Sequence, residues 1–286
     1  MRYNEKQKAK ERGTMEKKEI QAFIEYLYEN EKSEHTIEKY ERDVKQFYRY
    51  LKDAPLEKKA VREYKNELMK EYALRSINSM LASLNSYFRF IGKEELRMKS
   101  IKIQKEVFAE ERKNLKKKEY HRLIEAAQGD ERMKLLLETL GSTGMRVSEL
   151  QYVTVENYRS GRIKIYNKGK ERMILLPKKL IRKIKAYVRG RKIERGKIFV
   201  TRSGKSMDRV AIWRKMKKLG EKAMVREEKV YPHNLRHLYA KTYYKICNDV
   251  SRLADLLGHS SMDTTRIYLK EGVGSYQRDI ERLGLI

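Results

Sequence analysis

Apolar side chains in the first third of the chain recur at three- and four-residue intervals, the spacing of an amphipathic helix. The clearest of these stripes consists of Ile37, Tyr40, Val44, Phe47, Tyr48 and Leu51. Comparable stripes predict further helices over about 17–30, 57–72 and 74–91, the last of them ended by Gly92 as a left-handed cap. We therefore expect an all-helical domain at residues 15–100, preceded by a basic extension at residues 1–14.

The pattern changes beyond Gly92. The segment up to Lys116 is charged and has little helical periodicity, which predicts a linker, placed at residues 101–114. Helical patterns resume over about 118–127 and 131–140, and Gly141 and Gly144 are the predicted stops for the second of these helices. Further helices are predicted over about 178–188, 208–223, 232–246, 250–257 and 262–270.

One stretch of the second half follows the two-residue period of a strand. Residues 162–166 alternate polar and apolar side chains, and residues 171–176 become apolar toward their end. The turn-like string Asn-Lys-Gly-Lys between them predicts a β-hairpin with Lys168 at or beside its tip. The predicted fold class is therefore mainly α, with a mostly helical second domain at residues 115–286 that carries one small antiparallel sheet.

The charge balance makes nucleic acid the expected partner. The chain has 286 residues, and its 68 Lys and Arg against 40 Asp and Glu give a formal net charge of +28. Residues 1–112 hold 26 basic and 21 acidic side chains, whereas residues 113–286 hold 42 and 19, so the excess lies in the second half. Such a segment repels itself unless a polyanion neutralises it, although a solvated lysine-rich surface has the same composition.

Cysteine usage and hydropathy exclude several other classes. Cys247 has no partner within the chain, which rules out a disulfide scaffold and fits a reducing compartment. The chain has no run of about 18 apolar residues, and its first residues lack the apolar core of a signal peptide. We expect a soluble protein of the cytoplasm.

Four strings in the second half contain the residue types that could perform chemistry. They are Thr143–Leu150, Asn167–Lys170, His233–His237, and Leu257–Ser261 followed by Tyr268. His233 and Arg236 project from one face at the start of a predicted helix, where free N–H groups favour an anion. Arg146 follows Gly144 at another predicted helix start.

Each string alone allows a different interpretation. His233 and His237 have the spacing of a zinc pair, but a zinc site needs at least a third ligand, and we expect no metal. Residues 253–270 could form a helix-turn-helix with Gly258 in the turn, which would make the chain a DNA-binding regulator without catalytic activity. Tyr268 would then be an ordinary packing residue.

Together, in this order and at these intervals, the strings resemble the Arg…Lys…His-x-x-Arg…His…Tyr signature of the tyrosine recombinase family, which includes phage integrases and Xer recombinases. The resemblance extends over nearly the whole chain. The sequence from Ser33 through Thr36, Tyr40 and Phe47 resembles the start of the family's core-binding domain, and residues 115–127 resemble the entry to its catalytic domain. It implies a SAM-like helical core-binding domain and a catalytic domain that clamp DNA between them.

The resemblance also implies a role for each matching residue. Arg146 and Arg236 match the two arginines that hold the scissile phosphate, and Tyr268 matches the nucleophile. The other matches are the hairpin lysine Lys168, the histidines His233 and His259, and the supporting acidic residue Glu149. Lys170 lies two residues from Lys168 and competes for the lysine's role, although the string Asn-Lys-Gly-Lys favours Lys168.

The implied activity is site-specific recombination of double-stranded DNA through a 3′-phosphotyrosyl intermediate and a Holliday junction, without metal or ATP. The resemblance further implies a tetramer on DNA in which the tail after Tyr268 passes to a neighbouring protomer; a tail packed on its own domain is the alternative. A type IB topoisomerase has the same tyrosine, arginine, histidine and lysine set and stands as a second enzyme hypothesis. No motif indicates the target sequence, the biological role or a need for accessory proteins.

Overall fold

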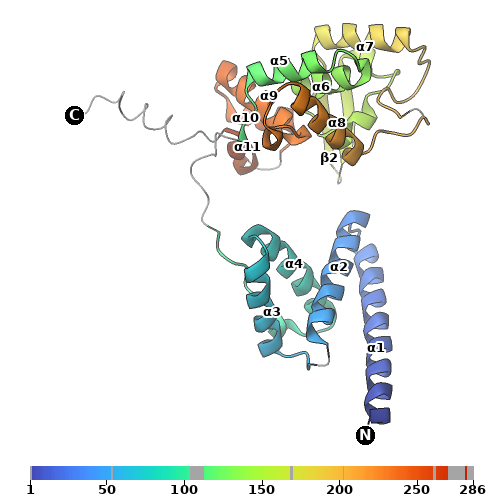
Figure 1. Ribbon diagram of the computed structural model, residues 1–286, viewed down its shortest axis with the longest axis vertical. Helices are drawn as coiled ribbons and strands as arrows, with labels where there is room; N and C mark the ends of the chain where they lie inside the picture. Colours follow the sequence, from blue (N-terminus) through green and yellow to red (C-terminus); the bar gives the residue numbers. More distant parts are fainter. Residues whose placement is uncertain are drawn as a thin grey trace. The chain divides into compact units, whose positions relative to one another are not determined.

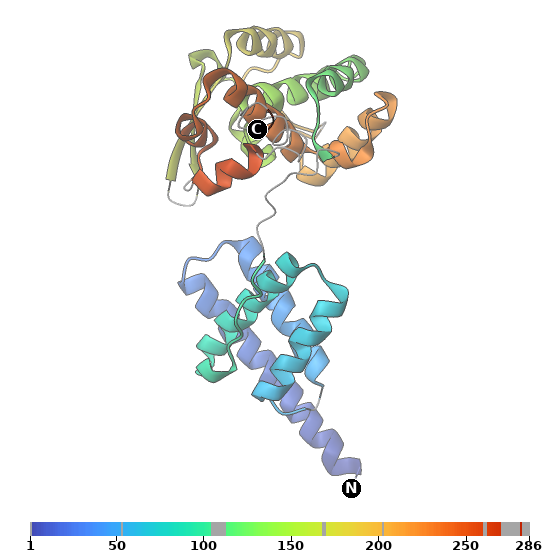
Figure 2. The ribbon, with the colours of Figure 1, turned by 90° about the vertical axis from the view of Figure 1, so that its left-hand side faces the viewer.

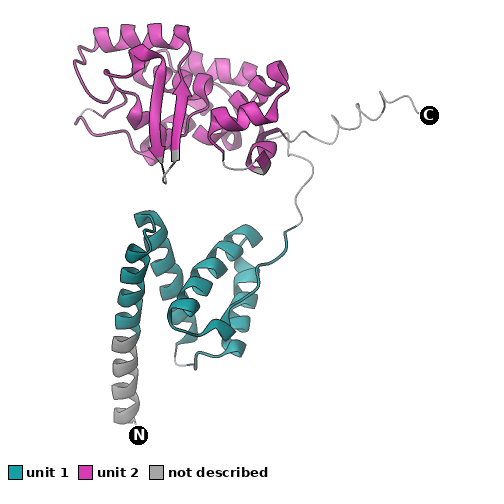
Figure 3. Cartoon of the chain, turned by 180° about the vertical axis from the view of Figure 1, so that it is seen from behind, with its two compact units in different colours: residues 1–105 teal, residues 106–286 magenta. Residues whose placement is uncertain are grey.

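The chain divides into two compact units, Met1–Lys105 and Glu106–Ile286 (Figure 3). The computed structural model describes residues 2–52, 54–103, 113–167, 170–201, 203–259, 262–269 and 281, with side chains from residue 16 onward except those of residues 167, 170 and 263. Within these residues, no helix combines the length and the apolar character needed to cross a membrane.

The first unit is helical throughout its regular structure. Its elements are α1 (Arg2–Glu29), α2 (Glu34–Leu51), α3 (Lys58–Glu71), α4 (Leu74–Phe90) and the 3-10 turn η1 (Glu94–Leu96) (Figure 1). Helix α2 packs against α1 and α4, and α3 packs against α4. Helix α1, which runs the length of the unit in Figure 2, begins at Arg2, so the predicted start near residue 17 was wrong.

Aromatic side chains fill the centre of this unit. The predicted stripe of α2 is buried at Val44 and Phe47, and the Phe47 ring lies 5.1 Å from that of Tyr64. The chain after Gly92 also joins this core, because Met98 is buried and its backbone N–H donates to Oδ1 of Asn85 at 2.8 Å. The charged segment that follows α4 is therefore packed against the first unit over at least its opening residues.

The second unit combines helices with one β-hairpin. Its elements are α5 (Lys117–Ala126), α6 (Glu131–Thr143), η3 (Val147–Tyr152), η4 (Tyr158–Ser160), β1 (Arg162–Asn167), β2 (Lys170–Leu175), α7 (Lys178–Gly190), α8 (Arg209–Lys222), η5 (Glu227–Lys229), α9 (Pro232–Cys247), α10 (Val250–Leu257) and α11 (Met262–Leu269). Helix α6 packs against α7 and α9, and α11 packs against α9 and α10. The predicted fold class, mainly α with one small antiparallel sheet, is confirmed.

The hairpin turns one side toward the core. Its antiparallel register pairs Ile163 with Ile174 and Ile165 with Arg172. Ile163, Ile165 and Ile174 are buried, and the side chain of Arg172 is only 9 % exposed. A charged side chain thus occupies a position on the apolar face of β2, because side chains two residues apart in a strand share a face.

The two glycines near the end of α6 differ in role. The helix continues through Gly141, so the predicted stop there was wrong; a Cβ on Gly141 would lie 2.7 Å from Oη of Tyr120, which explains the glycine by close packing. Gly144 ends the helix as predicted, with a left-handed φ of 63°. The chain then enters η3 directly, and this places Arg146 at the start of that turn.

Candidate active site

Glu149 fixes the position of Arg146. The backbone N–H of Arg146 donates to Oε2 of Glu149 at 2.7 Å, and its Nη1 donates to Oε1 at 3.1 Å. Glu149 is buried, whereas the Arg146 side chain is 39 % exposed. The carboxylate therefore anchors a guanidinium that still faces solvent.

Arg236, in the first turns of α9, is the second guanidinium of the site and is almost fully buried. Its Nη1 donates to the backbone oxygen of Gly144 and its Nη2 to that of Leu257, both at 2.6 Å. Burial lowers the pKa of Arg236, and the nearby charge of Arg146 lowers it further. This side chain thus ties the end of α6 to the end of α10 while it carries a charge beside Arg146.

Two histidines of the site are held in their neutral form. Nε2 of His259 lies 2.9 Å from Nη2 of Arg236. Burial, followed by the charges of Arg236 and Arg146, lowers the pKa of His259 to about 4. The pKa of His233 is also lowered, chiefly by burial and then by Arg236. A neutral imidazole can accept a proton at its unprotonated nitrogen. Nε2 of His259 already accepts a hydrogen bond from Arg236, so His233 is the one of the two rings that is suited to act as a base.

Tyr268 lies on α11 with its hydroxyl inside this cluster. Oη of Tyr268 is 3.1 Å from Nε2 of His233, and the Tyr268 ring stacks on that of His259 at 5.3 Å. The residue is only 5 % exposed, and its ring packs in a small apolar cluster with Ala240, Leu253 and Leu257. The ring is therefore in an apolar environment, but the hydroxyl faces a histidine.

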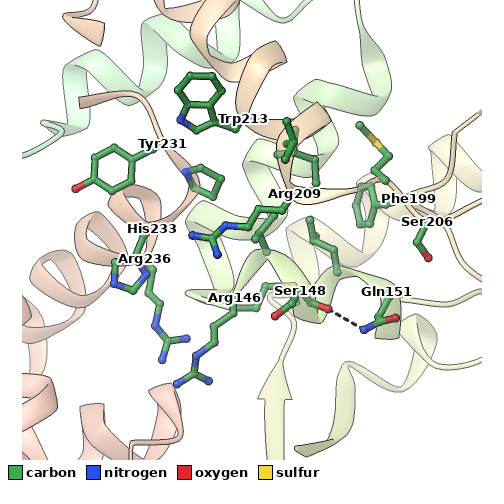
Figure 4. A pocket seen from close by; sticks show the side chains of 17 residues that line it. Arg146, Ser148, Gln151, Phe199, Ser206, Arg209, Trp213, Tyr231, His233 and Arg236 are labelled. Atoms are coloured by element: carbon green, nitrogen blue, oxygen red, sulfur yellow. Dashed lines mark hydrogen bonds between the residues drawn. The ribbon is translucent and has the colours of Figure 1, made fainter. Parts of the chain in front are cut away.

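A cavity of about 660 Å³ opens beside these groups. Its polar lining includes Arg146, Arg209, His233 and Arg236, and its aromatic lining includes Trp213 and Tyr231. In Figure 4 the side chains of Arg146 and Arg236 extend in the same direction, next to His233. Guanidiniums with this arrangement suit an anion such as a phosphodiester, which they can bind through paired, charge-assisted hydrogen bonds.

The structure brings together six of the residues singled out from the sequence: Arg146, Glu149, His233, Arg236, His259 and Tyr268. Lys168 lies outside the described residues, and so does the side chain of its competitor Lys170. The tail after Tyr268 is also outside them, apart from Leu269 and residue 281. Among the described residues, no cluster of three or more His, Cys, Asp or Glu side chains is suited to hold a metal.

Sequence reasoning missed three contacts of the site. Arg172 donates from Nη1 to Oε1 of Glu149 at 3.1 Å. The hydroxyl of Thr265 contacts Nδ1 of His259. The His237 ring lies 4.3 Å from that of Tyr268. A signal existed for Arg172, because it shares the apolar face of a predicted strand. Thr265 precedes Tyr268 by three residues, so helical spacing placed it on the same face of α11.

Comparison with known proteins identifies the family. Residues 113–273 match the phage integrase family, and residues 20–95 match the phage integrase N-terminal SAM-like domain. The chain is 32 % identical over 285 residues to tyrosine recombinase XerA of Pyrococcus furiosus, with 96 % of each chain covered. It is 27 % identical over 273 residues to tyrosine recombinase XerD of Staphylococcus haemolyticus, with 87 % of this chain and 92 % of the relative covered.

Solved structures have the same fold. A lambda integrase dimer bound to a COC′ core site matches with a TM-score of 0.71 and 19 % identity, over 88 % of this chain and 94 % of that one. XerH bound to its difH substrate before cleavage matches with a TM-score of 0.66 and 21 % identity, over 82 % of this chain and 76 % of that one. The chain belongs to the phage integrase family. Within that family it is a tyrosine-type site-specific recombinase, which disfavours the topoisomerase and the non-catalytic regulator hypotheses.

Proposed function

We propose that this recombinase cleaves and rejoins double-stranded DNA by attack of Tyr268 on a backbone phosphodiester. The observation that supports this role is the position of the Tyr268 hydroxyl, 3.1 Å from Nε2 of a neutral His233 and beside the buried guanidinium of Arg236. A nucleophile within hydrogen-bond distance of a base, next to fixed cations, is the arrangement that such an attack requires.

Arg146 and Arg236 would stabilise the charge that develops on the phosphate. The transition state gathers negative charge on the non-bridging oxygens, and two guanidiniums can neutralise it in place of metal ions. Arg236 is rigid because two backbone oxygens accept its hydrogen bonds, and Arg146 is held by Glu149. Each preorganised donor of this kind contributes about 3–4 kcal/mol to transition-state stabilisation.

Proton transfer would involve the histidines and the hairpin lysine. Phenols keep their proton at neutral pH, so the attacking oxygen needs a base, and Nε2 of His233 lies at the right distance to accept the proton. The oxygen–phosphorus bond forms while the bond from phosphorus to the 5′ oxygen breaks. Lys168 is the predicted donor of the proton to that leaving oxygen, and this role stays a prediction.

The products of the first step would be a 3′-phosphotyrosyl bond and a free 5′-hydroxyl. Because the tyrosyl ester conserves the energy of the broken bond, a 5′-hydroxyl from a second duplex can reverse the step without ATP. Exchange of one strand between two duplexes gives a Holliday junction, and a lambda integrase tetramer bound to a Holliday junction is among the structural matches. We place this reaction in the cytoplasm, on a tetramer linked by its C-terminal tails.

The test is covalent capture on a nicked duplex. A pool of duplexes with a randomised central sequence, each nicked so that cleavage releases a short fragment, traps the protein–DNA adduct for isolation and sequencing. We expect wild-type protein to form an adduct and Tyr268→Phe to form none while it retains DNA binding. Tyr244→Phe is the matched control, because Tyr244 packs against the same apolar cluster. An adduct formed by Tyr268→Phe would exclude Tyr268 as the nucleophile.

A second arm uses the enriched sequence in two differently labelled intact duplexes. Products that join the two labels support recombination. Relaxation of supercoiled DNA without such joint products would instead support a nicking-closing enzyme.

A further inference from the structure

Arg172 is a buried charge whose cost to the fold calls for a functional explanation. Its side chain is 9 % exposed, and its Nη1 donates to Glu149. Its Nε and Nη2 are buried without a hydrogen-bond partner among the described residues. Unpaired buried donors destabilise a fold, and an apolar side chain of similar length on this strand face would avoid that penalty.

The surroundings of Arg172 add a second cost. Burial lowers the pKa of Arg172 to about 10; Glu149 opposes this effect, and the charges of Arg236 and Arg146 reinforce it. Glu149 Oε1 accepts hydrogen bonds from both Arg146 and Arg172, so one carboxylate serves two guanidiniums. The positive charges therefore exceed the negative ones around this carboxylate.

The contacts of Arg172 reach two separate parts of the site. On one side it shares Oε1 of Glu149 with Arg146. On the other side the aliphatic part of the Arg172 side chain packs against Gly258, where a Cβ would lie 2.3 Å from Cδ of Arg172. Gly258 has a left-handed φ of 63° and directly precedes His259. The hairpin thus touches, through one side chain, both the anchor of Arg146 and the backbone that carries His259.

We propose that Arg172 is a positioning residue of the strand-cleavage site, which holds Glu149, and through it Arg146, in the geometry that binds the scissile phosphate. The inference rests on the proposed function of this site. Arg172 acts through its neighbours and needs no contact with the phosphate. Misplacement of a catalytic group by about 1 Å can slow a reaction by about a hundredfold, which sets the scale of the expected effect.

The test compares Arg172→Met with Arg172→Lys on the nicked duplex identified by adduct capture. We expect the methionine variant to cleave about tenfold to a hundredfold more slowly at saturating protein, with its Kd for DNA within about twofold of wild type. Its Tm should be no lower than that of wild type, because the buried charge is removed and Arg146 still pairs with Glu149. The lysine variant keeps a cation near Glu149 and should recover part of the rate.

A purely structural role gives the opposite pattern. In that case the methionine variant has a lower Tm than wild type, cleaves at the wild-type rate, or cleaves at the same rate as the lysine variant. Any one of these results overturns the inference. Arg162→Met, at an exposed position of the same hairpin, is the matched control and should leave rate and Tm unchanged. If wild-type protein forms no adduct at all, the proposed function fails instead.

A double-mutant cycle identifies the route of the effect. If Arg172 acts through Glu149, then Glu149→Gln and Arg172→Met combined should slow cleavage little more than the slower single variant does. Independent effects would multiply in the double variant, and that result would contradict the proposed route.

Discussion

The side-chain hydroxyl of Thr265 lies 2.8 Å from Nδ1 of His259, and this contact orients the imidazole ring. The opposite nitrogen, Nε2, lies 2.9 Å from Nη2 of Arg236. A guanidinium can only donate, so Nε2 accepts and the single proton of the neutral ring resides on Nδ1, which donates to Thr265. Thr265 is fully buried on α11, three residues before Tyr268.

Replacement of Thr265 by valine should therefore impair cleavage more than it impairs folding. The valine has the same shape but cannot accept the hydrogen bond from Nδ1, so the His259 ring loses one of the two contacts that orient it. We expect single-turnover cleavage to fall by roughly tenfold or more, and the free energy of unfolding to fall by about 1 kcal/mol.

Two variants control for this prediction. Thr265→Ser keeps the hydroxyl and should cleave close to the wild-type rate. Thr264→Val changes the adjacent threonine, which is exposed, and should alter neither rate nor stability. Equal rates for Thr265→Val and Thr264→Val would contradict the proposed link between Thr265 and His259.

The two arginines proposed to hold the phosphate should differ in how much they support the fold. Arg146→Ala removes a partly exposed side chain, so we expect cleavage to fall at least a hundredfold with only a small change in Tm. Arg236→Ala should cause a comparable loss of cleavage and also lower Tm, because it leaves two backbone oxygens without their donors and opens a cavity. Binding assays on the captured duplex should show largely retained affinity in both.

Two results would contradict this prediction for Arg146→Ala and Arg236→Ala. If the Tm of Arg146→Ala is as low as that of Arg236→Ala, then Arg146 has a structural role that its exposure does not indicate. If either variant cleaves at the wild-type rate, that residue does not belong to the site.

The second unit should lose stability between about pH 6.5 and pH 5. The pKa values of His237 and His259 are both lowered to about 4, chiefly by burial, against an ordinary value near 6.5. Between these values the unfolded chain binds protons that the folded chain does not, so the free energy of unfolding falls as the pH is lowered through this window and is regained above it. The pKa values of carboxylates such as Glu119 and Asp130 are lowered in the folded protein, so these groups affect the free energy of unfolding only at lower pH.

Urea unfolding followed by tryptophan fluorescence measures this effect, because the single tryptophan, Trp213, lies on α8 of the second unit. The unfolding midpoint should decrease from pH 7 to pH 5, and His237→Gln should make the decrease smaller. His35→Gln, at a side chain that is 94 % exposed in the first unit, should leave it unchanged. A constant midpoint over this range would contradict burial of the neutral histidines.

Gly258→Ala should disrupt the site more than its small size suggests. The alanine adds the strain of a left-handed φ and places its Cβ 2.3 Å from Cδ of Arg172, so the Arg172 side chain must move. We expect a lower Tm and slower cleavage. Gly196→Ala is the matched control, because Gly196 also has a left-handed φ, of 79°, but no heavy atom lies near its Cβ position. Equal effects of the two variants would show that strain alone is responsible.

The helices were largely predictable because their apolar stripes are local in the sequence. Val44 and Phe47 are buried as the spacing indicates, and α9 begins at residue 232, where the sequence predicts a helix to start. The end of α6 was predicted at two glycines, but only Gly144 ends the helix. Gly141 instead makes room for Tyr120, a residue of another helix, and no local pattern reveals such a contact.

The candidate site was predictable only as a set of residues. The spacing of His233 and Arg236 on one helix face is local, whereas the contact between Tyr268 and His233 joins two helices far apart in the chain. Arg172 reaches Glu149 only because the hairpin packs beside η3, an arrangement that depends on the whole second unit. Secondary-structure propensity and the spacing of apolar residues are local properties of the sequence, so they cannot specify contacts between distant elements.

The shared carboxylate of Glu149 has a consequence for work with the purified enzyme. Arg146 and Arg172 share this single carboxylate and the charge of Arg236 lies nearby, so we expect inorganic sulfate or phosphate to occupy the place proposed for the DNA backbone. A buffer rich in these ions should protect the protein during storage, since an anion bound only by the folded form raises its stability. The same buffer competes with substrate, so conditions that suit purification are the wrong ones for measuring cleavage.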